Sequence, residues 1–156
     1  MSDIPHNPHS AASIAGHPIH PMLVPFPIAF FVAALVCDLV FWQNGNAAWV
    51  TASVWLLGGG LVTAVLAALA GLTDVLGDGR VRNLSTAWLH AAGNIIIVLV
   101  ELYNWYLRFS TGDVAVVPTG LILSLIAVAG LLFTGWLGGE LVYRHRVGVS
   151  EPAKFP

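Results

Sequence analysis

Four long apolar stretches dominate this sequence and restrict what the chain can fold into. They cover about residues 25–42, 47–72, 84–109 and 118–142, and the second of them contains no charged residue. Each is close to the roughly 20 residues that a helix needs to cross the apolar core of a bilayer. Only 9% of the residues are charged, against about 25% in a soluble protein, so the chain lacks the charge to cover a water-facing surface. We therefore expect an integral membrane protein.

The connections between the stretches are short, which constrains how the helices are arranged. They cover residues 43–46, 73–83 and 110–117. Short connections place consecutive helices antiparallel and side by side. The sequence thus predicts an all-α fold, an up-down four-helix bundle over residues 21–143. A polar tail at 1–20 precedes this domain and a short tail at 144–156 follows it.

Charge and cysteine content exclude several other classes of protein. Six Lys and Arg residues against eight Asp and Glu residues give a formal charge of −2, so there is no basic patch to bind nucleic acid. Cys37 is the single cysteine and cannot form an internal disulfide. The lipid bilayer is the expected partner. Small residues are frequent in the second and fourth stretches, which suits close helix packing, a flat cofactor between helices or a homo-oligomer.

The basic residues predict an orientation in the membrane. With four crossings, both tails and the 73–83 connection share one side. Cytoplasmic segments of membrane proteins are enriched in Lys and Arg. Arg108 belongs to the opposite side, and five basic residues lie on the shared side: Arg80, Arg82, Arg144, Arg146 and Lys154. We therefore expect both termini in the cytoplasm.

Polar residues are concentrated at the cytoplasmic end of this predicted bundle. With a rise of about 1.5 Å per residue, His90 lies about 9 Å inside the third stretch, one turn before Asn94 on the same face. Other polar residues flank the stretches at the same end: His17, His20, Asp74, Glu140, Tyr143 and His145. Each proline in the segment 17–21 disfavours helix for the residue before it. We expect this segment to cap the bundle and turn one or both imidazoles inward.

Histidines from three segments at one end suggest three kinds of function. The leading hypothesis is a b-type haem with imidazole ligands, for electron transfer with another redox subunit. Asn94 and Tyr143 would lie beside this haem, and Arg80 and Arg82 would pair with its propionates. The first alternative is a non-haem site for a transition-metal ion (Zn, Cu or Fe), with these ligands: His17, His20, His90, His145, and Asp74 or Glu140. The second alternative is a non-catalytic subunit of a larger membrane complex.

A smaller polar group is expected toward the opposite end of the bundle. Asp38 lies about 20 Å and Glu101 about 25 Å from the cytoplasmic face, at 1.5 Å per residue. If these carboxyl groups face each other, one of them is expected to be protonated. The sequence slightly favours the simpler alternative, exposure of both side chains at the outer interface.

The segment Gly16-His-Pro-Ile-His-Pro-Met-Leu-Val-Pro-Phe-Pro27 is distinctive. In it the chain resembles a bacterial family of predicted four-helix membrane proteins of unknown function that carry a GHPxHPxxxxFP motif. Asp38, Asp74 and His90 fit the same resemblance, which covers about residues 14–149. It implies a multi-pass protein of the bacterial inner membrane and supplies no established activity. Relatives that look fused to a Rieske-type iron–sulfur domain imply membrane electron transfer.

Overall fold

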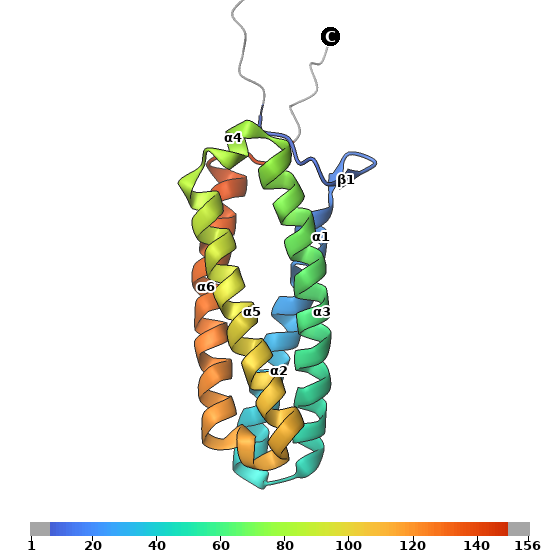
Figure 1. Ribbon diagram of the computed structural model, residues 1–156, viewed down its shortest axis with the longest axis vertical. Helices are drawn as coiled ribbons and strands as arrows, with labels where there is room; N and C mark the ends of the chain where they lie inside the picture. Colours follow the sequence, from blue (N-terminus) through green and yellow to red (C-terminus); the bar gives the residue numbers. More distant parts are fainter. Residues whose placement is uncertain (1–6, 150–156) are drawn as a thin grey trace, which may run out of the picture.

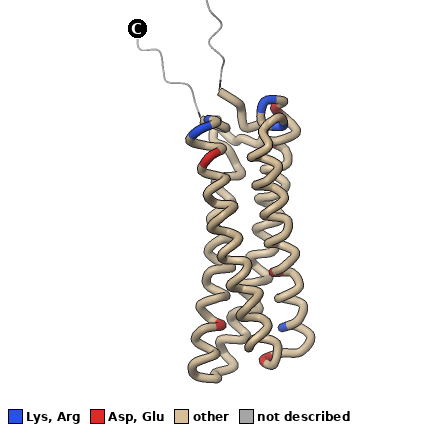
Figure 2. The backbone as a smooth tube through the Cα atoms, turned by 90° about the vertical axis from the view of Figure 1, so that its left-hand side faces the viewer, with Lys and Arg blue, Asp and Glu red and all other residues tan. Residues whose placement is uncertain are grey.

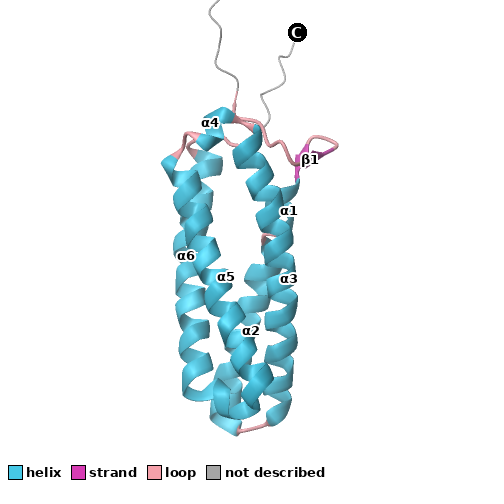
Figure 3. Ribbon diagram, viewed as in Figure 1, coloured by secondary structure: helices cyan, strands magenta, loops and turns pink. Residues whose placement is uncertain are grey.

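The computed structural model describes residues 7–149 and is built almost entirely from helices (Figure 3). The long helices run along one common axis (Figure 1): α2 (Pro25–Asn44), α3 (Ala47–Gly77), α5 (Ser85–Thr111) and α6 (Leu121–Tyr143). The shorter helices are α1 (Ile19–Leu23), α4 (Gly79–Arg82), the 3₁₀ turn η1 (Gly112–Ala115) and the π-type turn η2 (Val116–Gly120). A two-stranded antiparallel hairpin, β1 (Ser13–Ile14) and β2 (His17–Pro18), precedes α1.

The outer surface of the bundle is apolar, as a lipid-facing surface requires. Large side chains point outward, with Trp55 78% exposed and Leu132 76% exposed. Within residues 7–149, three helical runs are long and apolar enough to cross a membrane: Ile19–Asn44, Ala47–Gly77 and Ser85–Tyr143. The third run contains both α5 and α6, which lie side by side (Figure 1). The all-α membrane class predicted from the sequence agrees with this structure.

The turns explain how the chain reverses direction. Gly45 ends α2 in the left-handed region (φ 65°), which favours glycine, and donates its backbone N–H to the Phe41 carbonyl at 2.8 Å. Asn46 then caps α3 by accepting the Ala48 N–H at 3.0 Å. Between α5 and α6 the backbone is extended at Val117. The connection expected at 110–117 is therefore largely helical turns, and the one expected at 73–83 holds the end of α3 and all of α4.

The middle of the bundle is an apolar core. Phe31 and Ala34 of α2 pack against Leu57 and Ala64 of α3, and all four are buried. A Cβ atom at Gly60 would lie 2.5 Å from Cε1 of Phe31, so this glycine allows the phenylalanine ring to lie directly on α3. Close packing thus accounts for part of the glycine-rich second stretch.

An N-terminal strap, residues 7–14, is fastened across the end of the bundle where both ends of the described chain lie (Figure 1). The carboxylate of Asp74 accepts hydrogen bonds from Ser10 Oγ and from the Ala12 N–H, both at 2.8 Å. Asp78 accepts the His9 N–H at 2.9 Å. Two carboxylates at the end of α3 therefore hold the strap in place.

The strap also contacts the segment that follows α6. The Gly148 N–H donates to the Pro8 carbonyl at 2.9 Å, and Asn7 Nδ2 donates to the Val149 carbonyl at 3.1 Å. The strap is thus hydrogen-bonded both to the end of α3 and to the segment that follows α6.

Candidate functional site

Two of the predicted histidines meet inside the bundle. His20 on α1 and His90 on α5 are partly buried, with ring centroids 6.2 Å apart and ring planes at 85° to each other. His20 lies on α1, although the sequence predicts no continuous helix at this segment. The helix can form because Pro21 lies in its first turn, where a missing backbone N–H does no harm. The inward-turned imidazole expected from this segment is therefore that of His20.

Backbone carbonyls fix the orientation of both rings. Nδ1 of His20 lies 2.7 Å from the Ala67 carbonyl oxygen on α3, and Nδ1 of His90 lies 2.9 Å from the Thr134 carbonyl oxygen on α6. A carbonyl oxygen only accepts hydrogen bonds, so each neutral ring carries its hydrogen on Nδ1 and a lone pair on Nε2. This is the arrangement by which proteins orient metal-ligating histidines.

Asn94, predicted beside His90, forms the second contact of that ring. Its Nδ2 donates to the His90 carbonyl at 2.8 Å and lies 3.2 Å from Nε2 of the same residue. The Thr134 hydroxyl donates to Oδ1 of Asn94 at 3.2 Å. His90, Asn94 and Thr134 therefore form one connected polar group between α5 and α6.

Glycines make room for the two imidazole rings. A Cβ atom at Gly71 would lie 2.9 Å from Nδ1 of His20, and one at Gly138 would lie 3.3 Å from Cε1 of His90. At this end of the bundle, glycines of the second and fourth stretches thus face histidines. Any larger side chain at Gly71 would displace the His20 ring.

The other predicted ligands have separate partners. His17 is exposed, and its Nδ1 lies 3.0 Å from the Ala15 carbonyl oxygen; Asp74 holds the strap. Glu140 forms an ion pair with Arg144 at 3.1 Å, while Tyr143 is 85% exposed. Across residues 7–149, no group of three or more His, Cys, Asp and Glu side chains could hold a metal ion. The six predicted ligands, which also include His145, are therefore not brought together.

The arginines proposed for haem propionates lie at the same end, on α4. Arg80 forms an ion pair with Asp78 at 2.8 Å, and Arg82 is exposed. The Arg80 guanidinium holds the pKa of the Asp78 carboxyl below its usual range, and the hydrogen bond from the His9 N–H acts in the same direction. Asp78 thus remains ionised at the point where it binds the strap.

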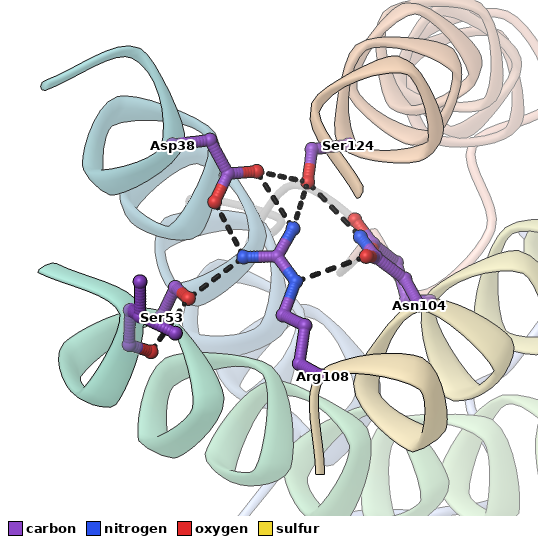
Figure 4. A network of polar contacts seen from close by, with 7 residues as sticks. Asp38, Ser53, Asn104, Arg108 and Ser124 are labelled. Carbon is purple, nitrogen blue, oxygen red and sulfur yellow. Dashed lines mark hydrogen bonds and ion pairs between the residues drawn. The ribbon is translucent and has the colours of Figure 1, made fainter. Parts of the chain in front are cut away.

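A second site lies at the opposite end of the bundle, around an ion pair between Asp38 on α2 and Arg108 on α5 (Figure 4). Both side chains are fully buried. Nη1 of Arg108 contacts Oδ1 of Asp38, and Nη2 donates to Oδ2 at 2.7 Å. Arg108 lies in the last turn of α5, where a cation interacts favourably with the helix dipole. The pair is bidentate, the strongest form of a guanidinium–carboxylate contact.

Hydroxyl groups from the two remaining long helices complete this ion pair (Figure 4). Ser53 on α3 accepts from Nη1 of Arg108 at 2.7 Å, and Ser124 on α6 accepts from Nη2 at 3.1 Å. Ser124 also donates to Oδ2 of Asp38 at 2.8 Å. The antiparallel order places the ends of α2 and α5 beside the starts of α3 and α6, so all four helices contribute to one network.

Asn104 connects the ion pair to Glu101, one turn away on α5. Its Oδ1 accepts from Nε of Arg108 at 3.0 Å, and its Nδ2 donates to Oε2 of Glu101 at 2.8 Å. Among residues 7–149, Oε1 of Glu101 is the one buried side-chain polar atom without a hydrogen-bond partner. The expectation that Asp38 and Glu101 are exposed at the interface is wrong, because both are 0% exposed.

The comparison with protein families agrees with this membrane architecture. A family model described as "Predicted membrane protein (DUF2231)" matches residues 16–151. The chain belongs to this family. The match begins at the glycine of the GHPxHP segment and includes every helix of the structure. No curated protein and no solved structure matches the chain. The resemblance stated from the sequence is thus confirmed: this is a DUF2231 protein, a predicted membrane protein of unknown function.

Sequence reasoning found the histidine end of this DUF2231 protein and placed Asp38 and Glu101 together at the opposite end, but it missed the buried network to which they belong. A signal for it was present: Glu101, Asn104 and Arg108 follow spacings of three and four residues, which places them on one face of a helix. Two further polar residues, Asp38 and Ser124, lie at the matching depth on other stretches. Arg108 was used only as the basic residue on the side opposite the termini.

Proposed function

We propose that this DUF2231 protein crosses the bacterial cytoplasmic membrane four times, with both termini in the cytoplasm. Helices α5 (27 residues) and α6 (23 residues) are each long enough to cross alone, which supports four crossings. Figure 2 shows the basic residues concentrated at the end that carries both chain ends. At the other end Arg108 is neutralised by Asp38. This asymmetry supports a cytoplasmic position for the termini; Lys154 lies outside the described residues.

Cysteine labelling tests this topology. A Ser110→Cys variant places a thiol at the exposed end of α5, and a Ser85→Cys variant places one at its exposed start. In intact cells we expect a membrane-impermeant maleimide to label position 110 from outside. Position 85 should react only after the cells are permeabilised. The reverse pattern would overturn the orientation, and equal labelling of both from one side would overturn four crossings.

We further propose that the bundle binds a b-type haem through His20 and His90 and transfers electrons in the membrane. The observation that carries this proposal is the pair of imidazoles, which come from two helices and approach to 6.2 Å between centroids with both Nδ1 atoms bound to carbonyls. Axial imidazole ligation of haem uses the remaining nitrogen, Nε2. At His90 a metal displaces only the longer of the two Asn94 contacts, the one at 3.2 Å.

A single transition-metal ion bound by the same two imidazoles is the second candidate. The close approach of Gly71 to His20 and of Gly138 to His90 favours it, because little space surrounds the rings. An ion needs much less space than a macrocycle. Two imidazoles leave the remaining coordination positions of the ion for water or for a substrate.

An absorption spectrum of the detergent-purified protein separates these functions. We expect a Soret band that shifts on reduction with dithionite and is lost in His20→Ala and His90→Ala. His17→Ala is the matched control, because His17 is exposed and close in sequence, and it should keep the band. Stoichiometric metal without a Soret band would select the second candidate. Neither signal in protein supplied with haemin and with metal would overturn both.

Electron transfer requires a donor and an acceptor, so we propose that the protein works with a further redox subunit of the same membrane. The exposed apolar surface of the long helices is available to such a subunit as well as to lipid. Chemical reduction by dithionite bypasses this subunit. If the proposal holds, membranes should reduce the bound cofactor with a physiological donor, and the purified protein alone should not.

A further inference from the structure

The buried network contains one carboxyl group more than its single cation can neutralise. Arg108 provides one positive charge, while Asp38 and Glu101 are both acidic and all three are at most 2% exposed. An unpaired charge in a water-free interior is strongly unfavourable. In the membrane interior, such groups are paired, neutralised or functional. One of the two carboxyl groups must therefore be neutralised by something other than Arg108.

The hydrogen bonds show which carboxyl group is ionised. Both oxygens of Asp38 accept from the Arg108 guanidinium, and Oδ2 accepts from Ser124 as well. A carboxylate that accepts several charge-assisted hydrogen bonds is stabilised in its ionised form. Asp38 and Arg108 thus form a closed neutral pair, and the remaining donors of Arg108 are directed to Ser53, Ser124 and Asn104.

Glu101 has the opposite surroundings. Its one donor is the uncharged amide of Asn104, and Oε1 has no partner within the described residues. The groups that act on it are Asn104 and Arg108 on its own helix and Asp38 on α2, and the cation among them is already paired. These surroundings do not balance a second negative charge.

We propose that Glu101 is a proton-binding site inside the membrane, and that its carboxyl group carries one proton near neutral pH. The proton makes the whole network neutral, with Asp38 and Arg108 as the fixed ion pair and Glu101 as the titratable member. Asn104 transmits the influence of the pair to Glu101, because it contacts both groups. The site is independent of the proposed cofactor: Glu101 lies 11 residues after His90, about 16 Å along the axis of α5.

Infrared spectroscopy of the full-length protein in lipid tests this site. Near neutral pH we expect the carbonyl stretching band of a protonated carboxylic acid, and we expect its complete loss in Glu101→Gln. Glu140→Gln is the matched control, because Glu140 is paired with Arg144 near the end of α6, and it should keep the band. A wild-type spectrum without the band, or a band that survives in Glu101→Gln, would overturn the proposal.

A second variant separates a proton site from a merely structural glutamate. In Asp38→Asn the Arg108 guanidinium has no carboxylate, so Glu101 should ionise to replace it and the band should disappear although Glu101 is still present. A band that persists in this variant would overturn the role of the ion pair. Appearance of a sodium-sensitive carboxylate band in the wild type, in place of the acid band, would show that a metal cation neutralises Glu101 and would also overturn the proposal.

Discussion

The two ends of helix α5 handle polar groups inside the bundle in different ways. At one end, His90 is bound by backbone carbonyl and side-chain amide groups, and its ring remains partly accessible. At the other end, Arg108 is fully buried and bound by side chains from every long helix. The histidine end spares a ring nitrogen for a ligand, whereas the arginine end satisfies the guanidinium entirely from within the protein.

The difference indicates that the arginine end stabilises the bundle, whereas the histidine end is suited to ligand binding. A side chain held by backbone carbonyls can exchange its remaining contact without disturbing its own orientation. A charge held by a complementary charge cannot lose its partner without leaving that charge unpaired in the interior. We therefore expect substitutions at the arginine end to affect stability most, and substitutions at the histidine end to affect ligand binding most.

The largest expected effect is that of Arg108→Met. This change removes the cation and leaves the Asp38 carboxylate buried without a charged partner, which typically costs about 3–5 kcal/mol. We expect the free energy of unfolding, measured by denaturant titration in mixed micelles, to fall by that amount. Arg80→Met, at the exposed pair on α4, is the control and should unfold as the wild type does. Equal stability of Arg108→Met and Arg80→Met would contradict the expectation that the arginine end determines the stability of the bundle.

A smaller loss is expected from Gly120→Ala, which crowds the ion pair without removing it. The new Cβ atom would lie 2.9 Å from Nη2 of Arg108 and 3.1 Å from Oδ1 of Asn104. Overpacking of this kind costs about 1–3 kcal/mol. Gly135→Ala on α6 has no atom within 4 Å of the new Cβ and should be neutral or slightly stabilising in the same titration. A stable Gly120→Ala protein would show that the network tolerates displacement.

Asn94→Ala tests the histidine end and should cost less. The variant loses the 2.8 Å hydrogen bond to the His90 carbonyl and the contact with Thr134. We expect the free energy of unfolding to fall by about 0.5–1.5 kcal/mol. Removal of the amide also frees Nε2 of His90. Affinity for added haemin or metal should therefore rise or stay constant while stability falls, as measured by absorption titration. A parallel loss of affinity would show that Asn94 takes part in binding.

The smallest effect concerns the strap and is expected only in acid. Arg80 lowers the pKa of Asp78 in the folded protein, relative to about 3.9 for an unperturbed aspartate. The stabilising contribution of the Asp78 carboxylate is therefore fully present above about pH 4. It is lost as the pH falls through the lowered pKa of Asp78 in the folded protein. Hydrogen exchange at the His9 amide, corrected for intrinsic rates, should therefore accelerate only below about pH 4. Asp78→Asn should accelerate it at every pH.

The sequence predicted the long helices and part of the polar architecture. The apolar stretches located α2, α3, α5 and α6 because a membrane helix has a minimum length and few charges. His90 and Asn94 were found because an isolated polar pair inside an apolar stretch is conspicuous. The position of His20 could not be derived, because it depends on how α1 packs against α3.

The arginine end was predicted only in part: the depths of Asp38 and Glu101 were derived, but their burial and their connection to Arg108 were not. Asp38, Ser53 and Ser124 are single polar residues on three different stretches. Their convergence depends on the rotation of each helix about its axis, which small residues such as Gly60 and Gly120 determine through close packing. The same limit applies to the metal site proposed from four histidines and Asp74 or Glu140, because the structure brings only His20 and His90 of these residues together. Depth along the membrane normal can be counted from the sequence, whereas helix rotation cannot.

The hydrogen bonds between the strap and the segment after α6 have a consequence for how the protein is made. Asn7 and Pro8 leave the ribosome well before their partners Gly148 and Val149. The strap therefore cannot complete its contacts until every helix has been synthesised and inserted. Its contacts with Asp74 and Asp78 can form earlier, because both carboxylates belong to the end of α3.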